Sequence, residues 1–241
     1  MSVDFAIEPL AEDALLLRFG DGIDIDVNAR VHAAAHAIRA AKLAGIVDVA
    51  PAYATLLVRF DPFSRGGDAL PEAVTRVLDR GFQQGEDNEP EASASRKLPT
   101  QRTEIPVCYG AEYGPDLGAI ARRAGMTPDE VVERHLRAEY TVAMLGFAPG
   151  FPYLLGLDPA LHAPRRANPR TRVPAGSVAI GGAQTGIYPR ELPGGWNLIG
   201  RTPLVLFDSG RHPPCLLAPG DRVRFCAVDA DEFRRLAERD A

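Results

Sequence analysis

One long segment, from Met144 to Asp208, constrains the fold of this chain more than any other. Glycine, proline, arginine and aromatic residues alternate there with short runs that favour β-strands, and acidic residues are scarce. Glycine permits positive φ and proline fixes φ, so this density predicts loops held in defined shapes on a β scaffold. Rigid loops on such a scaffold usually carry binding and catalytic groups. We therefore expect a small-molecule site in this segment.

A change of composition predicts two domains. Residues 83–102 (QQGEDNEPEASASRKLPTQR) are first acidic and then rich in Ser, Ala and Pro, and they break every periodic pattern. Segments of this composition cannot bury enough apolar surface to fold by themselves. We predict a first domain at 1–85, a linker at 86–102 and a second domain at 103–241.

The first domain shows an alternating pattern of short strands and amphipathic helices. Their order, ββαββα, predicts a small α/β sandwich with a mostly antiparallel sheet. The predicted strands are Asp4–Pro9, Ala14–Phe19, Ile46–Ala50 and Thr55–Phe60, and the predicted helices run from Asp26 or Asn28 to Ala44 and over Leu70–Phe82.

The second domain is predicted to be mainly β, a barrel or closed sheet with two or three helices outside it. Thr127 and Glu130 form a capping-box pattern with Pro128 at the first helical position, which predicts a helix to about Ala138. Further predicted elements are the strands Thr103–Tyr109, Ser177–Ile180 and Arg222–Ala227, and the helices Asp116–Ala124 and Asp231–Arg239, the last capped by Asp229.

Composition excludes several classes of function. The net charge of −5 argues against a nucleic-acid surface. No apolar run is long enough to span a bilayer, and the first residues do not form a secretory signal. Three cysteines (Cys108, Cys215 and Cys226) without CxxC spacing are typical of reduced thiols, so we expect a cytoplasmic protein.

Standard nucleotide and metal motifs are absent from the sequence. It contains no GxxxxGK[ST] loop, GxGxxG, HExxH or paired Cys/His zinc spacing. His32 and His36 stand one helical turn apart, but no carboxylate or third ligand lies near them in sequence, so we predict no metal site. Ser177 follows a glycine but enters a strand, which favours a structural role over that of a nucleophile.

Four arginines lie within eight residues, between prolines that stiffen the segment. The planar guanidinium donates two parallel hydrogen bonds to carboxylate or phosphate oxygens, so this group predicts an anion site. The alternative is that the arginines pair with acids of this chain or of a partner. Among Arg165, Arg166, Arg170 and Arg172 we favour Arg172 for function, because it directly precedes the glycine-rich strand.

A glycine-rich turn follows that strand. Gly181 and Gly182 allow close backbone approach, and the Gln184 amide offers one acceptor and two donors, which suits recognition of an amide or ureido group. The alternative is a structural turn with Gln184 bonded to backbone. Tyr188 and Trp196 flank a Pro-Gly-Gly sequence and can wall a pocket or belong to the core.

His135 stands near the end of the capped helix. It can exchange a proton near neutral pH, or it can stabilise the helix C-terminus through the dipole. The sequence Phe147–Tyr153 is too aromatic and too rich in proline for a solvent loop, so we expect a rigid wall or an interface there.

Taken together, these motifs resemble those of a known family. The signatures of the 5-oxoprolinase B-subunit family (PxpB/KipI) are similar to MLGFAPGFPYLLGLDP at 144–159, PRTRVPAGSVAIGGAQTGIYP at 169–189 and PGGWNLIGRTPLVLFD at 193–208. The family is also described as allophanate hydrolase subunit 1 or as the carboxyltransferase subdomain C/D family. The resemblance extends over nearly the whole chain and is most specific between residues 144 and 208.

The resemblance implies an α+β fold of two domains, a ferredoxin-like N-terminal domain and a cyclophilin-like β-barrel. It also implies one component of an ATP-dependent 5-oxoprolinase, which opens the lactam of 5-oxo-L-proline to L-glutamate. The C and A subunits of that enzyme are then its partners, the C component being related to allophanate hydrolase subunit 2. ATP is a co-substrate, bound with the help of a partner.

The resemblance also implies roles for residues at matching positions. Arg172 and Arg201 meet carboxylate or phosphoryl oxygens, Gln184 and the Gly181-Gly182 backbone hold the lactam amide, and His135 moves a proton. We count Tyr188 and Trp196 among the substrate-binding residues because they can form the walls of this pocket.

Two other functions remain open at this point. One is a carboxyltransferase or allophanate-type component of urea metabolism, which would need a separate biotin carrier because no biotin-attachment motif surrounds a lysine here. The other is an inhibitor that binds a histidine kinase through its barrel face.

Overall fold

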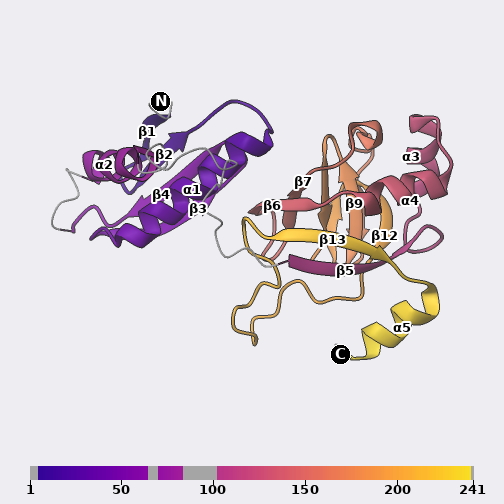
Figure 1. Cartoon of the computed structure of the whole chain (residues 1–241). Helices are drawn as coiled ribbons and strands as arrows, with labels where there is room; N and C mark the ends of the chain where they lie inside the picture. The colour runs from indigo at the N-terminus through magenta and orange to yellow at the C-terminus, as the bar shows by residue number, and fades with distance from the viewer. Residues whose placement is uncertain (1–4, 65–69, 84–101, 240–241) are drawn as a thin grey trace. The chain divides into compact units, whose positions relative to one another are not determined.

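The computed structural model describes residues 5–64, 70–83 and 102–239. The chain divides into two compact units, Met1–Pro99 and Thr100–Ala241, each with its own apolar core (Figure 1). The predicted linker 86–102 lies outside the described residues except for Arg102, as does Asp4 of the first predicted strand. The domain limits therefore stay predictions.

The first unit consists of four antiparallel strands and two helices in the predicted order ββαββα. The sheet order is β1-β2-β4-β3, so β2 and β3 are parallel to each other with β4 between them. Helix α1 connects β2 to β3, which makes a split β-α-β unit. The ferredoxin-like description of this unit stays a prediction. The elements are β1 (Ala6–Ala11), β2 (Ala14–Arg18), α1 (Ile25–Ala41), β3 (Ile46–Pro51), β4 (Thr55–Phe60) and α2 (Leu70–Gln83).

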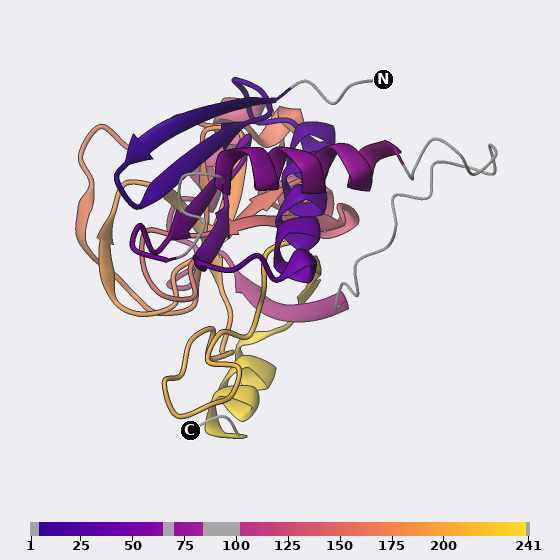
Figure 2. The same ribbon diagram turned by 90° about the vertical axis from the view of Figure 1, so that its left-hand side faces the viewer.

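One face of this sheet is buried under both helices, which cross each other above it (Figure 2). Alternate strand residues point to that face because side chains alternate along a strand. The buried set includes Leu15, Leu17, Leu56 and Val58 from the strands, and Val31, Ala34, Ala35 and Ile38 at helical spacing on α1.

Helix α1 is shorter at its C-terminus than the sequence pattern predicts. It ends at Ala41, because Lys42 takes a left-handed conformation (φ 46°) and donates its backbone N–H to the carbonyl of Arg39. At the other end, the carboxylate of Asp24 accepts hydrogen bonds from the backbone N–H groups of Asp26 and Val27. The helix therefore begins at Ile25, with Asp24 as its cap, rather than at Asp26 or Asn28.

The second unit contains a closed barrel of seven strands, which confirms the predicted closed sheet. The strand order is β10-β7-β6-β13-β5-β12-β9, and β13 and β5 pair in parallel while the other neighbours are antiparallel. The cyclophilin-like name stays a prediction. The strands are β5 (Arg102–Tyr109), β6 (Tyr140–Leu145), β7 (Pro152–Leu155), β9 (Ser177–Gly181), β10 (Gln184–Ile187), β12 (Asn197–Arg201) and β13 (Arg222–Ala227).

Helices and a short ribbon accompany the barrel. The capping box predicted for α4 is present: Thr127 Oγ1 accepts from Glu130 N at 3.2 Å, and Glu130 accepts from Thr127 N at 2.7 Å. Asp229 caps the last helix by accepting from Glu232 N at 2.8 Å. These elements are α3 (Leu117–Ala124), α4 (Pro128–Arg137), the 3-10 turn η2 (Pro159–Leu161), α5 (Ala230–Arg239), and the pair β8 (Arg170–Val173) and β11 (Leu192–Gly194).

Strand alternation gives the barrel two different faces. Inward residues, including Val178 and Ile180, join the main core. Outward residues of the same strands form a second cluster, which we call the outer-face cluster and define by Phe151, Tyr153, Ala179, Tyr188, Trp196 and Leu198. A residue of β9 or β10 can therefore belong to either environment, depending only on its register.

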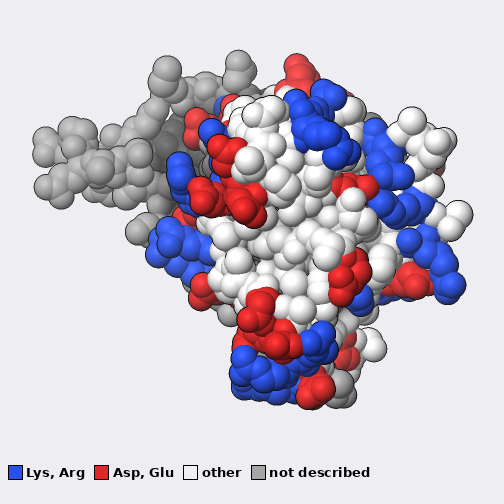
Figure 3. Space-filling view, turned by 90° about the vertical axis from the view of Figure 1, so that its right-hand side faces the viewer, with Lys and Arg blue, Asp and Glu red and all other residues white. Residues whose placement is uncertain are grey.

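The charges on one side of the molecule are mixed in sign. Figure 3 shows basic and acidic side chains that both border an area of uncharged atoms. On this face, therefore, neither sign of charge dominates. Within the described residues, no helix has both the length and the apolar content needed to cross a membrane.

Candidate functional site

Gln184 places an amide group on the outer face of the barrel. Its neighbour Thr185 points inward, so Gln184 points outward, and its cross-strand partner is Gly181. The Gln184 side chain is 9% exposed. Among the described residues its amide has no hydrogen-bond partner. The amide is not among the fully enclosed polar groups, so it reaches the surface with donors and an acceptor available, and Gln184 is a candidate ligand-binding group.

The indole ring of Trp196 lies directly on Gly181. A β-carbon added to Gly181 would lie 2.5 Å from the indole Cδ2, so only glycine fits there. Trp196 also contacts Phe151 and Tyr153 edge to face, with ring centroids 5.7 Å and 5.8 Å away. The structure thus brings together Gly181, Gln184 and Trp196, as the sequence predicts.

Tyr188 belongs to the same cluster and is 2% exposed. Its hydroxyl would be 2.1 Å from a β-carbon at Gly194, so this second glycine also gives room to an aromatic ring. Burial raises the pKa of Tyr188, and Arg165 is among the charges that act in the opposite direction. Trp196 is also buried, with 5% of its surface exposed. Both rings are therefore buried in the outer-face cluster, directly beneath its surface. The sequence offered two interpretations of these aromatic residues, pocket wall and core, and their burial is compatible with both.

Arg165 is the arginine that faces this cluster. Its guanidinium carbon lies 5.8 Å from the centroid of the Trp196 ring, a cation–π geometry. The side chain is exposed and makes no ion pair within the described residues. Arg165 thus offers a positive charge to an anionic group beside the Trp196 ring.

Two of the other arginines are occupied by Asp116, a residue for which the sequence predicted no functional role. The carboxylate of Asp116 accepts from Arg170 Nη1 and Nη2 at 2.8 and 3.0 Å, and from Arg166 Nη1 at 2.8 Å. It also accepts from the backbone N–H of Leu198 at 2.8 Å. The alternative interpretation of the arginine cluster, pairing with acids of this chain, therefore holds for Arg166 and Arg170.

Asp116 stays charged in spite of its burial. The residue is 5% exposed, and this desolvation acts to raise the pKa of its carboxyl group. The hydrogen bonds from Arg170 and Leu198 and the two guanidinium charges outweigh it, so the pKa of Asp116 lies below its ordinary value.

Arg172 and Arg201 lie elsewhere. Arg172 pairs with Glu191 at 2.8 Å in a solvent-exposed contact of the β8–β11 ribbon. Arg201 donates from Nε to the carbonyl of Ala175 at 2.7 Å, and its guanidinium lies 6.0 Å from the Phe233 ring centroid. Both guanidinium groups are thus bonded within this chain, and their anion-binding role stays a prediction.

His135 lies inside the barrel core rather than at the outer-face cluster. It is completely buried, with its Nδ1 2.8 Å from the hydroxyl of Tyr109 and its Nε2 3.2 Å from Thr185 Oγ1. The Thr185 hydroxyl donates to the carbonyl of Ala179, so it accepts from His135, which assigns the proton to Nε2. Burial lowers the pKa of His135 to about 3.

A neutral, fully bonded imidazole at this position suits neither role expected from the sequence. It is shielded from any ligand at the outer face, and without a charge it cannot stabilise the helix C-terminus through the dipole. We interpret His135 as a structural residue that links α4 to the inner side of β10.

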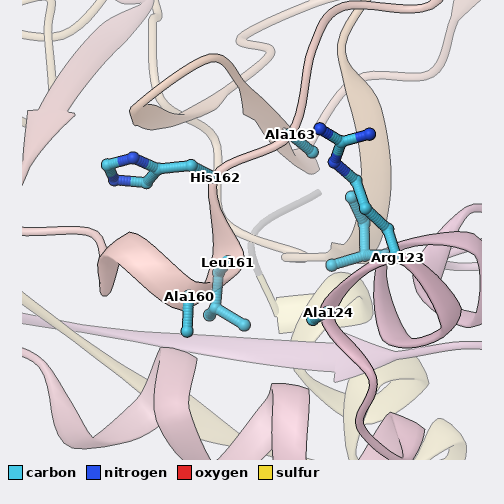
Figure 4. A pocket seen from close by; sticks show the side chains of 7 residues that line it. Arg123, Ala124, Ala160, Leu161, His162 and Ala163 are labelled. Atoms are coloured by element: carbon cyan, nitrogen blue, oxygen red, sulfur yellow. The ribbon is translucent and has the colours of Figure 1, made fainter.

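A pocket of about 380 Å³ lies between α3 and η2. Arg123 and His162 are its charged or titratable side chains, and Figure 4 shows that the His162 ring points away from Arg123. None of the predicted site residues lines it. Ala163 on its wall pairs with Gly182 of the glycine-rich turn.

No group of three or more His, Cys, Asp or Glu side chains within the described residues is arranged to hold a metal ion. His32 and His36 both lie on α1, without such a group around them.

Comparison with known proteins gives a match over nearly the whole chain. The family model described as carboxyltransferase domain, subdomain C and D, matches residues 5–217. The B subunit of 5-oxoprolinase from Bacillus subtilis is 41% identical over 238 residues, 99% of each chain. The Escherichia coli O157:H7 protein of the same name is 52% identical over 161 residues, 67% of this chain and 70% of that one.

A solved structure shares the fold, and a more distant protein is similar in sequence. The crystal structure of TTHA0988 matches with a TM-score of 0.74 and 39% identity over 90% of this chain, which spans only 40% of that longer chain. Urea amidolyase of Saccharomyces cerevisiae is 26% identical over 245 residues, covering 93% of this chain and 13% of that protein.

The buried state of His135 predicts a pH dependence of stability. Between pH 6.5 and about 3 the unfolded chain binds a proton at His135 that the folded chain does not, so the free energy of unfolding falls as the pH falls. The slope from this residue is at most about 1.4 kcal/mol per pH unit. His135→Gln should show a shallower decline than the unchanged chain in urea unfolding curves measured from pH 7 to 4.

The control is His162→Gln, which removes an exposed histidine of the same unit and should leave the slope unchanged. Parallel curves for His135→Gln and the unchanged chain would contradict the assignment of a neutral, buried His135.

The contact of Trp196 with Gly181 predicts a specific sensitivity. Gly181→Ala should displace the indole, because its new methyl group would overlap the ring, and should cost about 1–3 kcal/mol of stability. Trp196 is the single tryptophan, so fluorescence reports its environment directly, and we expect a red shift with increased acrylamide quenching.

Gly118→Ala is the matched control. It makes the same chemical change in α3, where the nearest atom would lie at an ordinary 3.6 Å. An unchanged Trp196 spectrum in Gly181→Ala would show that the ring does not depend on this glycine.

Proposed function

Because the chain belongs to the family of the carboxyltransferase domain, subdomain C and D, we propose that it is the B subunit of a 5-oxoprolinase. In this proposal it helps to open the lactam of 5-oxo-L-proline to L-glutamate. The observation that carries the proposal is the 41% identity with the B subunit of a 5-oxoprolinase over 99% of both chains. A match of this extent supports the same role in an assembly, beyond a shared fold.

The outer-face cluster supports the substrate class. 5-Oxoproline carries a carboxylate and a lactam amide on one small ring. Arg165 is placed to pair with the carboxylate, and the Gln184 amide can donate to the lactam oxygen or accept from the lactam N–H. In this proposal, Arg165 takes the place that the sequence had suggested for Arg172 and Arg201.

The chemistry of the lactam explains why ATP is needed. A lactam carbonyl is a weak electrophile, and transfer of a phosphoryl group from ATP to its oxygen makes the carbon open to attack by water. Ring opening then leaves an acyl phosphate, and a second water molecule releases phosphate and glutamate. In total one ATP and two waters are consumed for each lactam opened, with ADP and phosphate as the other products.

We place the ATP site with a partner rather than in this chain alone. The sequence contains neither a phosphate loop nor GxGxxG. In the proposed assembly this chain supplies the groups that hold 5-oxoproline, and the C and A subunits complete the enzyme. His135 is assigned no proton transfer because its ring is fully buried.

A second candidate is a carboxyltransferase component of urea metabolism. The similarity to urea amidolyase over 93% of this chain favours it. Such a protein would take a carboxyl group from a separate biotin carrier to an amide acceptor. Urea is neutral, so it would use Gln184 and leave Arg165 without a partner.

The direct test is reconstitution. Co-expressed with the A and C subunits, the chain should support release of ADP that depends on 5-oxoproline and is absent with urea. Gln184→Ala and Arg165→Ala should each lower kcat/KM about tenfold or more, because each removes a hydrogen bond or ion pair worth about 1.5–3 kcal/mol.

Arg134→Ala is the matched control, since it removes an arginine from an exposed pair with Asp158 at 2.7 Å. Arg172→Ala distinguishes the two sets of site residues, and we expect it to retain activity. Turnover that survives the Gln184→Ala, Arg165→Ala double substitution would refute the site. Urea-dependent carboxyl transfer without 5-oxoproline turnover would favour the second candidate.

A further inference from the structure

Asp116 joins three segments of the second unit. Its carboxylate holds Arg166 and Arg170, which lie on either side of residues 167–169, and it also binds the backbone of Leu198. The backbone N–H of Asp116 donates in turn to the carbonyl of Leu198 at 2.9 Å. One acid at the start of α3 thus fastens the arginine segment to β12.

Arg165 is held between two such attachments. On one side, Asn197 Nδ2 donates to the carbonyl of Pro164 at 2.9 Å. On the other, the backbone N–H of Arg166 donates to the carbonyl of Gly195 at 2.7 Å, and its side chain reaches Asp116. The residues before and after Arg165 are therefore tied to the residues before and after Trp196.

This arrangement leaves few positions for the Arg165 guanidinium. An exposed arginine normally samples many rotamers, and ordering such a side chain has a substantial entropic cost. Here the backbone is bonded on both sides of Arg165, which fixes where the side chain starts, and the guanidinium carbon lies 5.8 Å from the centroid of the Trp196 ring. Pre-organisation of this kind raises affinity without adding a contact.

The charges of Asp116, Arg166 and Arg170 also leave Arg165 available to an anionic ligand. Asp116 carries one negative charge and meets two guanidinium groups, so the group of three keeps one positive charge. A free acid near Arg165 would compete with an anionic ligand, whereas Asp116 is already saturated by Arg166, Arg170 and Leu198.

We propose that Asp116 is a positioning residue that holds Arg165 over Trp196 and thereby sets the affinity of the outer face for a carboxylate ligand. The ligand part of this inference rests on the proposed function, with 5-oxoproline as the ligand. The geometric part concerns Arg165 and Trp196 alone and does not depend on it.

The experiment uses Asp116→Asn, Arg165→Ala and the double variant in the complex with the A and C subunits. Asp116→Asn should raise the KM for 5-oxoproline about tenfold with a smaller change in kcat. Arg165→Ala should do the same, and the double variant should be no worse than Arg165→Ala, because both changes remove one interaction. Effects that multiply in the double variant would overturn the proposal and leave Asp116 a purely structural residue.

Fluorescence of the single tryptophan provides the readout that needs no ligand. Asp116→Asn and Arg165→Ala should change the emission and acrylamide quenching of Trp196 in the same direction, and the double variant should add nothing further. If 5-oxoproline is not turned over but this pattern appears, the proposed function fails and the positioning role stands. An unaltered Trp196 signal in Asp116→Asn would overturn the positioning role itself.

Two further variants complete the experiment, one as a milder substitution and one as a control. Arg170→Gln removes the two-pronged ion pair but leaves Asp116 bonded to Arg166 and Leu198, so it gives a milder form of the same effect if Asp116→Asn does not fold. Glu191→Gln is the control, because it breaks an exposed arginine–carboxylate pair on the nearby ribbon and should change neither KM nor fluorescence.

Discussion

The buried carboxylate of Asp116 is the interaction on which the organisation of the second unit's outer face depends. Taking a carboxylate out of water costs several kcal/mol unless its oxygens are paired. The hydrogen bonds that offset this cost come from Arg166, Arg170 and Leu198. They form only when α3, the arginine segment and β12 are all in place. Segments that are 50 to 82 residues apart in sequence must therefore form together.

Two adjacent residues of β10, Gln184 and Thr185, lie on opposite faces of the closed barrel and therefore in different environments. Thr185 points inward and completes the hydrogen bonds of a neutral histidine, whereas Gln184 points outward and presents an amide that no described residue binds. A shift of one residue in register would exchange the two environments. The glycines at 181 and 186 fit the same logic, because each leaves room on the outer face for an aromatic ring, Trp196 and Phe151 respectively.

Local signals in the sequence were sufficient for much of the fold. The cap at Thr127, the cap at Asp229 and the strand Arg222–Ala227 depend on neighbouring residues, and the structure has them where they were expected. The choice among the four arginines could not be made in this way, because the deciding partner, Asp116, lies about 50 residues earlier. Arg172 stood next to the glycine-rich strand in sequence, yet its side chain is bonded to Glu191. His135 looked like a proton carrier until its inward direction and its two ring contacts were known.

Charge gives a physical reason to favour an acidic ligand over a neutral one at the outer face. Of the four arginines in the 164–172 segment, Arg166 and Arg170 pair with Asp116, Arg172 pairs separately with Glu191, and Arg165 lies over Trp196. Asp116 neutralises one charge, so two positive charges remain, one of them on Arg165 beside the indole. A neutral ligand such as urea would leave these charges to solvent, whereas a carboxylate would pair with Arg165 in a site already shielded by Trp196 and Tyr188. The same excess positive charge would oppose a basic ligand, so the balance around Asp116 selects for ligand charge as well as for geometry.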